Sequence, residues 1–415
     1  MNTTTVTIIG AGQAGLAMSR TLTDRSIDHV IVERGTVANS WSKERWDSLR
    51  LLTPNWMTRL PGYSYTGADP EGYMTAAEVV YFLNSYWRTF DAPIHEHTSV
   101  DRVTHTDDGH MVDTSNGPIS TKAVVVATGA CSNPRIPSLA SALPSHIRQI
   151  APIHYRNPAG IGDGRVLVVG ASASGAQIAD ELRRAGKDVT LAVGDHVRLP
   201  RTYRGMDIHW WMDAIGLLDE RYTEMEDIGR ARRLPSLQLV GSPERRTLDL
   251  GTLRAAGVQL VGRFVGVAGG NAQFSGSFAN QCKSADLKLE RLLQAIDQFA
   301  ADHGLDPELP APDRPAPTAV PPAATTAPLS GFGTVVWATG FRPSYPWLDT
   351  ALLDRKGAIN HDGGVMARPG MYVLGLPFTR RRKSSFIDGV GPDAQDLAAH
   401  LGAYLDSQAS PAYVS

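Results

Sequence analysis

A glycine-rich turn between an apolar strand and a helical segment constrains this chain more than any other feature. The apolar run 6–9 leads directly into Gly10, Gly12 and Gly15, and helical spacing of small and apolar residues follows. The first glycine permits a tight turn, the second lets a pyrophosphate approach the backbone, and the third lets the helix pack closely on the strand. Phosphates can then meet the free N–H groups at the helix N-terminus. The pattern predicts a dinucleotide-binding Rossmann unit.

A carboxylate completes this first unit. The apolar run 30–32 ends in Glu33, which lies 18 residues after Gly15. An acid at the end of the second strand can accept hydrogen bonds from the ribose hydroxyls of an adenosine. Strand, glycines, helix, second strand and terminal acid therefore stand in the register of a dinucleotide site.

The same pattern recurs about 160 residues later, which predicts a second dinucleotide site. The run 166–169 leads into Gly170, Ser172 and Gly175, and a helical segment and the strand 189–193 follow. Ser172 replaces the middle glycine, but its side chain is small enough for phosphate approach and offers a hydroxyl group.

The second site is predicted to take NADP rather than NAD. The position that matches Glu33 is Val193, so no carboxylate repels a 2′-phosphate there. Arg198 and Arg201 follow, and a guanidinium can bind a phosphate with two hydrogen bonds. The alternative is that these arginines are solvated loop charges, because Asp195 stands among them.

A second internal repeat links the two units. The segments 124–129 and 335–340 are apolar runs that both end in Ala-Thr-Gly. We expect Thr128, Gly129 and Gly340 to pass close to a dinucleotide or to act as a hinge, since glycine adopts backbone shapes that other residues resist. An ordinary turn after a strand is the alternative.

These patterns predict an α/β fold with two Rossmann-like dinucleotide-binding domains, the second inserted into the first. The first domain is expected to hold residues 1–155 and 331–415, and the second residues 156–305. The proline-rich stretch 306–330 is expected to be a linker rather than a packed element. An amphipathic helix is expected over 287–299 and a solvated loop over 380–383.

Composition excludes several other classes. Lys plus Arg total 40 and Asp plus Glu total 42, which argues against a general nucleic-acid binder. No apolar run is long enough to span a membrane and no signal peptide is visible, so a cytoplasmic protein is expected. The two cysteines, Cys131 and Cys282, are far apart, which excludes a Cys-x-x-Cys redox centre. Residues 95–97 (His-Glu-His) lack a third ligand, so no metal site is predicted.

The sequence resembles the class B flavin monooxygenases, a group that includes the flavin-containing, plant indole-pyruvate and Baeyer–Villiger monooxygenases. The resemblance covers most of the chain outside the proline-rich stretch. It rests on the two glycine motifs and the repeated Ala-Thr-Gly. Further segments that carry it are Trp41, 45–54, 60–62, 337–343 and 388–394.

The resemblance implies FAD and NADPH as cofactors and O2 and a small organic molecule as substrates. The implied reaction transfers one oxygen atom from a flavin C4a-(hydro)peroxide, in sulfur or nitrogen oxidation or in ketone or keto-acid oxygenation. A homodimer is a further expectation. The residues that the resemblance places around FAD are Gly10, Gly12, Gly15, Glu33, Trp41, Arg45, Asp388 and Gly389. Asn55 and Arg246 are the implied catalytic residues, with a purely structural role as the alternative for each.

The chain departs from the family at one motif. The family fingerprint Phe-x-Gly-x-x-x-His-x-x-x-Trp/Tyr, anchored on Tyr155, falls on Ser145, Ile147 and Ala151. Only the aromatic residue is kept. Two alternatives therefore stay open, namely an NADPH-dependent flavin oxidoreductase or oxidase without oxygen insertion, and a non-enzymatic redox sensor that binds both nucleotides.

Overall fold

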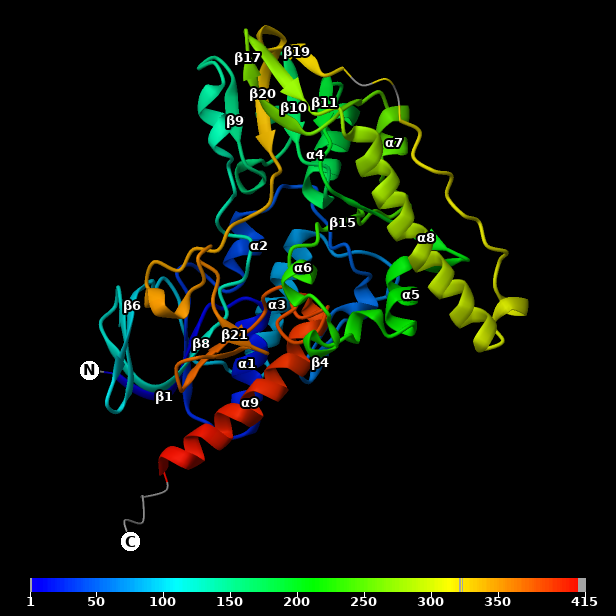
Figure 1. Ribbon diagram of the computed structural model, residues 1–415. Helices are drawn as coiled ribbons and strands as arrows, with labels where there is room; N and C mark the ends of the chain where they lie inside the picture. Colours follow the sequence, from blue (N-terminus) through cyan, green and yellow to red (C-terminus); the bar gives the residue numbers. More distant parts are fainter. Residues whose placement is uncertain (1, 321, 323, 410–415) are drawn as a thin grey trace.

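Two mostly parallel sheets, each covered by helices, organise the molecule (Figure 1). The computed structural model describes residues 2–320, 322 and 324–409. The first sheet has the parallel order β23-β8-β1-β2-β5, and β22 and β21 extend it antiparallel beyond β23. A hairpin, β6–β7, attaches to β8. The strands are β1 (Asn2–Ile9), β2 (His29–Val32), β5 (Ile94–His95), β6 (Val100–Thr106), β7 (Gly109–Thr114), β8 (Ile119–Val126), β21 (His361–Asp362), β22 (Val365–Met366) and β23 (Met371–Val373).

The second sheet is parallel throughout, with the order β16-β11-β10-β20-β9. The strand β10, which leads into the second glycine motif, lies between β11 and β20, just as β1 lies between β2 and β8. The predicted α/β class with two Rossmann-like domains is therefore confirmed. The strands are β9 (Arg148–Ile150), β10 (Arg165–Val169), β11 (Val189–Ala192), β16 (Gln259–Val261) and β20 (Phe332–Trp337).

The chain leaves the first sheet after β8, builds the second sheet and returns with β21, β22 and β23, so the second domain is an insertion. The strands at 148–150 and 332–337, which we assigned to the first domain, both lie in the second sheet. The reason is that each nucleotide-binding strand pairs with its own strand ending in Ala-Thr-Gly. β8 pairs with β1, whereas β20 pairs with β10.

Three helices cover one face of the first sheet, α1 (Gln13–Asp24), α3 (Ala76–Arg88) and α9 (Ile387–Ala409). Their apolar faces and the side chains of β1 and β8 form one buried core. In the second domain α4 (Ala173–Arg184) and α7 (Leu250–Ala255) pack against the sheet in the same way. This burial fixes the two glycine turns at the carboxyl ends of the strands.

A separate apolar core joins the two domains. It combines α5 (Ile208–Ala214) and α8 (Phe278–Asp302) of the second domain with Met57 of the first. Trp211 of α5 and Ile296 of α8 are fully buried in it. The helix expected over 287–299 lies inside α8, which is longer at both ends.

Residues 306–320 of the predicted proline-rich linker are mostly exposed, but polar contacts bind them to α8. Figure 1 shows it running beside α8 before it reaches β19 (Thr326–Pro328). Arg314 forms ion pairs with Glu290 and Asp297 of α8, and the Thr318 amide donates to Asp286 at 2.8 Å. β19 then pairs with β18 (Asn271–Phe274), the partner of β17 (Phe264–Ala268). Prolines keep the stretch extended, and polar contacts hold it against the helix.

Gly15→Ala tests the backbone packing on which the first domain depends. A β-carbon on Gly15 would lie 1.8 Å from the Gly10 carbonyl oxygen, so the helix must move away from the strand. We expect the free energy of unfolding to fall by about 3 kcal/mol or more in urea denaturation, the upper range for overpacking. The matched control is Gly402→Ala in α9, where no atom lies within 4 Å. That substitution should raise the free energy of unfolding by about 0.5–1 kcal/mol. Equal effects of the two substitutions would contradict the packing argument.

Candidate functional site

The first glycine turn has the geometry of a phosphate cradle. Gly10 has φ +109°, and a β-carbon on it would lie 2.7 Å from the Ala127 carbonyl oxygen. By contrast, a β-carbon on Gly12 would meet no atom within 4 Å. Gly12 is the N-cap of α1 and no side chain caps the helix there. The backbone N–H groups of the first helical turn therefore face open space, which fits a bound pyrophosphate.

Glu33 stands beside this cradle, as the sequence predicted from its place at the end of β2. Its carboxylate is buried and accepts hydrogen bonds from the amides of Ala11 and Gly35, each at 2.9 Å. Each carboxylate oxygen keeps a further lone pair. The two backbone hydrogen bonds fix the carboxylate and leave it able to accept further hydrogen bonds from ribose hydroxyl groups.

The segment around Trp41 lies next to the same cradle. Trp41 belongs to α2 (Asn39–Lys43), and its Nε1 donates to Gln13 Oε1 at 3.5 Å. The Arg45 guanidinium lies 5.2 Å over the Trp41 ring. Gln13 Nε2 in turn donates to the Ser385 carbonyl at 3.5 Å. The structure thus brings Trp41, Arg45 and the segment before α9 to the N-terminus of α1.

The second glycine turn repeats the construction of the first. A β-carbon on Gly170 would lie 2.3 Å from the Ala338 carbonyl oxygen, and one on Gly175 would lie 1.8 Å from that of Gly170. Ser172 caps α4 by position, and its side chain makes no capping hydrogen bond. The repeated Ala-Thr-Gly is explained by this geometry, because its alanine carbonyl lies directly under the first glycine of each motif.

The segments that follow the two Ala-Thr-Gly motifs pair with each other where the chain crosses between domains. The Arg135 amide donates to the Gly340 carbonyl at 2.9 Å, and the Arg342 amide donates to the Asn133 carbonyl at 2.9 Å. Pro134 and Phe341 form an antiparallel bridge between these bonds. Gly129 and Gly340 both have positive φ, at +68° and +82°. The outgoing and returning crossings are therefore one paired unit with glycines at its ends.

The structure does not place Arg198 and Arg201 at a phosphate site, contrary to the prediction. Arg198 is buried and pairs with Asp249 at 2.9 Å and with Asp286 at 2.8 Å. Arg201 is fully buried and donates to Asp207 and to the Leu52 carbonyl, each at 2.8 Å. The alternative of solvated loop charges is wrong as well, because both guanidinium groups turn into the interior.

The two residues implied to be catalytic are also engaged in structural contacts. Asn55 Nδ2 donates to the Asp69 carbonyl and Asn55 Oδ1 accepts from the Met74 amide, both at 2.9 Å. Both ends of the amide are thus used to hold the loop 69–74. Arg246 donates to Asp180 of α4 at 2.6 Å. These contacts match the structural alternative for each residue.

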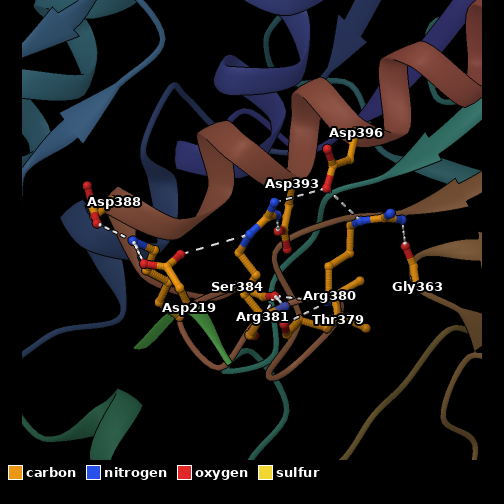
Figure 2. Close-up of polar contacts among 11 residues, drawn as sticks. Asp219, Gly363, Thr379, Arg380, Arg381, Ser384, Asp388, Asp393 and Asp396 are labelled. Carbon is orange, nitrogen blue, oxygen red and sulfur yellow. Dashed lines mark hydrogen bonds and ion pairs between the residues drawn. The ribbon is translucent and has the colours of Figure 1, made fainter. Parts of the chain in front are cut away.

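The four consecutive bases at 380–383 form a buried ion-pair cluster rather than the expected solvated loop. Figure 2 shows Arg380 and Arg381 directed toward α9, where Asp393 and Asp396 lie. Arg381 is buried and contacts Asp393 at 2.5 Å and Asp396 at 3.1 Å, while Arg380 donates to Asp396 at 3.2 Å. Four like charges fit in the interior because carboxylates of α9 and of the second domain neutralise them.

Asp388 at the start of α9 belongs to the same cluster. Arg59 donates to one carboxylate oxygen at 2.6 Å and Lys383 to the other at 3.1 Å. Lys383 also reaches Asp219 of the second domain at 3.0 Å. A β-carbon on Gly389 would lie 1.8 Å from the Lys383 carbonyl oxygen, so only glycine fits there. Asp388 and Gly389 therefore anchor the start of α9.

The cysteines and the metal-ligating residue types that the structure describes form neither a disulphide nor a metal centre. Cys131 is exposed in the loop after β8, whereas Cys282 is buried in α8, and both are free. Within residues 2–320, 322 and 324–409, no cluster of three or more His, Cys, Asp or Glu side chains is arranged to hold a metal ion. In the same described part of the chain, no helix is both long and apolar enough to cross a membrane.

Comparison with known proteins identifies the family. The pyridine nucleotide-disulphide oxidoreductase family matches residues 7–209. The chain is 32% identical over 395 residues to an uncharacterised CzcO-like oxidoreductase of Geobacillus kaustophilus, covering 94% of this chain and 96% of the relative. It is 29% identical over 418 residues to the probable indole-3-pyruvate monooxygenase YUCCA9 of Arabidopsis thaliana, covering 95% and 88%. The chain belongs to the class B flavin monooxygenase family.

A solved structure agrees on the fold. A flavin-containing monooxygenase from Stenotrophomonas maltophilia superposes with a TM-score of 0.69 at 21% identity, covering 98% of this chain and 100% of the other. The predictions of family, of an oxidoreductase and of FAD and NADPH as the cofactors of this family are confirmed.

Two residues that hold Asp388 were not found from the sequence, namely Arg59 and Lys383. Arg59 lies outside any motif and meets Asp388 only through the fold. Lys383 closes a run of bases whose partners are up to 164 residues away.

Asp207→Asn tests whether the buried Arg201 locks the two domains together. Asp207 accepts from Arg201 at 2.8 Å and from the Tyr73 hydroxyl of the first domain at 2.6 Å. Removing the carboxylate leaves a buried guanidinium unpaired, so the free energy of unfolding at pH 7 should fall by about 3–5 kcal/mol. Asp24→Asn, which breaks the exposed pair with Arg20, should change it by less than about 1 kcal/mol.

The pH dependence of the same variant provides a separate test. Burial alone would raise the pKa of Asp207, but contacts with His209 and the charge of Arg201 outweigh it and lower the pKa to about 2. The resulting stabilisation is present above the ordinary pKa near 3.8 and is lost as pH falls toward 2. About 1.8 kcal/mol of the difference between wild type and Asp207→Asn should therefore disappear from pH 4 to pH 2. A difference that stays constant over this range would rule out the ion pair as its source.

Proposed function

We propose that this chain is an FAD- and NADPH-dependent monooxygenase that transfers one oxygen atom from O2 to a small organic substrate. The observation that carries the proposal is the pair of equivalent dinucleotide turns, joined by the two hydrogen-bonded crossing segments. Family membership supports the same reaction class. The substrate is expected to be a thioether, an amine, a ketone or a keto acid, and a cytoplasmic homodimer stays a prediction.

The first site is the proposed FAD site. The N–H groups at Gly12 and the first turn of α1 would hold the pyrophosphate, and Glu33 would hold the adenosine ribose. Trp41 and Arg45 lie beside this turn and would line the cofactor. Asp388, at the start of α9, would lie toward the ring system.

The second site is the proposed NADPH site. Gly170, Ser172 and Gly175 would hold its pyrophosphate at the N-terminus of α4. Thr128, Gly129 and Gly340 lie on the crossing segments between the two sites. Arg198 and Arg201 have no part in this assignment, because their guanidinium groups are paired in the interior.

FAD held at the first glycine turn would supply the redox chemistry, namely hydride acceptance from NADPH and reactivity toward O2. The chain contributes binding, orientation and exclusion of water. Met57 and Trp211 close the apolar core between the domains, and Tyr73 and Asp207 add a buried polar contact across it. A dry interface of this kind protects reactive oxygen species from water.

The positions of the cysteines argue against a disulphide reductase, although that class shares the fold family. Such an enzyme needs two neighbouring thiols that accept electrons from the flavin. Cys131 is exposed in a loop and Cys282 is buried within the core of the second domain. The chain has two cysteines in total, so no second pair is available.

An NADPH oxidase without oxygen insertion is the second candidate, and the fingerprint segment favours it. Ala151, where the family has histidine, is buried. The segment that follows is bound to the Trp41 region, since the Asp47 amide donates to the Arg156 carbonyl at 2.9 Å and Asn157 donates to Asp47 at 2.6 Å. The segment therefore contacts the first domain through a backbone amide and an asparagine side chain.

Measurement of oxygen transfer distinguishes the candidates. The purified protein with FAD is mixed with NADPH in air, with and without a panel of thioethers, amines, ketones and keto acids. Oxygenated product that accounts for most of the NADPH consumed is the expected result. Hydrogen peroxide equal to the NADPH consumed across the whole panel would favour the oxidase. Negligible NADPH consumption despite bound FAD would favour a redox sensor.

Glu33→Ala tests the assignment of the first site to FAD. Loss of hydrogen bonds to a charged group should raise the Kd for FAD by about 10- to 100-fold. The measurement is quenching of flavin fluorescence on titration of the apoprotein, with unfolding curves of both proteins as a check on folding. Glu308→Ala, an exposed acid beside α8, is the control and should leave the Kd unchanged. A folded Glu33→Ala protein that binds FAD as tightly as wild type would refute the assignment.

A further inference from the structure

The two dinucleotide sites can be compared position by position through their hydrogen bonds. The Gly10 amide donates to the Val32 carbonyl at 2.8 Å, and the Gly170 amide donates to the Ala192 carbonyl at 2.9 Å. The residues that follow, Glu33 and Val193, are therefore equivalent. The Glu33 amide bonds to β5 at 3.0 Å, and the Val193 amide bonds to β16 at 2.9 Å. β5 and β16 are thus equivalent as well.

This equivalence locates the adenosine end of the second site. Val193 occupies the ribose-binding position, but its side chain is apolar and fully buried, so it cannot distinguish a 2′-hydroxyl from a 2′-phosphate. Discrimination between a 2′-hydroxyl and a 2′-phosphate must therefore come from the residues that follow β11 and from those that follow its neighbour β16. The charged groups at these two strand ends are Asp195 and Arg263.

Arg263 lies over the end of β11. Its Nε lies 3.7 Å from the β-carbon position of Gly194, and its Nη2 contacts Asp195 Oδ2 at 3.1 Å. Its backbone is fixed, because its carbonyl accepts from the Ser275 amide at 2.8 Å. The Arg263 side chain is 52% exposed and that of Asp195 is 71% exposed. The guanidinium is thus anchored at its base and open to a ligand at its tip.

We propose that Arg263 holds the 2′-phosphate of NADPH and that Asp195 competes with this phosphate for the guanidinium. The proposal rests on the proposed function of the second site. An exposed ion pair is weak, so a phosphate can displace the carboxylate. A dinucleotide without the phosphate leaves the pair intact. Asp195 therefore limits the preference for NADPH, and Arg263 creates it.

The experiment uses the FAD-loaded protein and two fragments of the coenzyme, 2′,5′-ADP and 5′-AMP. Their Kd values are measured by titration calorimetry, which does not depend on turnover. Arg263→Ala should raise the Kd for 2′,5′-ADP by about 10- to 100-fold, the usual effect of losing a charge-assisted phosphate contact. Binding of 5′-AMP should stay within twofold. Arg291→Ala on α8, which removes an exposed arginine elsewhere in the domain, should change neither value.

Asp195→Asn tests the competing role. We expect 2′,5′-ADP to bind about two- to fivefold more tightly, which corresponds to an exposed ion pair, with no change for 5′-AMP. In the Arg263→Ala background the same substitution should give less than half of that gain, because the guanidinium for which Asp195 competes is missing.

The outcomes separate this proposal from the function on which it rests. Wild type that binds both fragments, with Arg263→Ala affecting them equally or not at all, overturns the role of Arg263 and leaves the dinucleotide site standing. An equal gain from Asp195→Asn with and without Arg263 overturns the competition. Wild type that binds neither fragment overturns the dinucleotide site and this proposal together.

Discussion

Contact between backbone atoms at the two glycine turns is the constraint on which the rest of the structure depends. At each turn the third glycine packs on the carbonyl of the first, and the first glycine packs on an alanine carbonyl of the neighbouring strand. No side chain fits between these atoms. Helix, nucleotide-binding strand and neighbouring strand are therefore fixed together, and the N-terminus of each helix opens at the strand ends. The Ala-Thr-Gly repeat is the second half of this contact, which explains why it occurs once in each domain.

Between the domains, buried charges add to the apolar core that joins them. Arg201 is fully buried yet contacts Leu52 of the first domain and Asp207 of the second. Lys383 likewise joins Asp388 to Asp219. A buried guanidinium is costly when its charge is left without a partner. Separating the domains would take the Leu52 carbonyl away from Arg201 and Asp219 away from Lys383, so these contacts favour the observed arrangement.

Local patterns allowed the two glycine motifs and Glu33 to be predicted, because each depends on residues close in sequence. The errors share one physical cause, which is that a charge finds its partner through the fold. Arg198 and Arg201 follow the second motif and looked like phosphate ligands, yet Arg198 pairs with Asp249 and Asp286, 51 and 88 residues later. The strand at 332–337 was assigned to the wrong sheet for the same reason, since sequence does not reveal which strand it pairs with.

The two equivalent sites differ in how far they are enclosed, and this difference bears on their roles. Around the first site, Glu33 is buried and Trp41 and the segment before α9 contact the first residue of α1. At the second site the corresponding charges, Asp195 and Arg263, are more than half exposed. Under the proposed function, the contacts around the first site would slow the release of its ligand. A ligand in the second site would compete only with an exposed, weak ion pair. Under the proposed function, one turn geometry thus serves both a resident flavin and an NADPH that is replaced in every cycle.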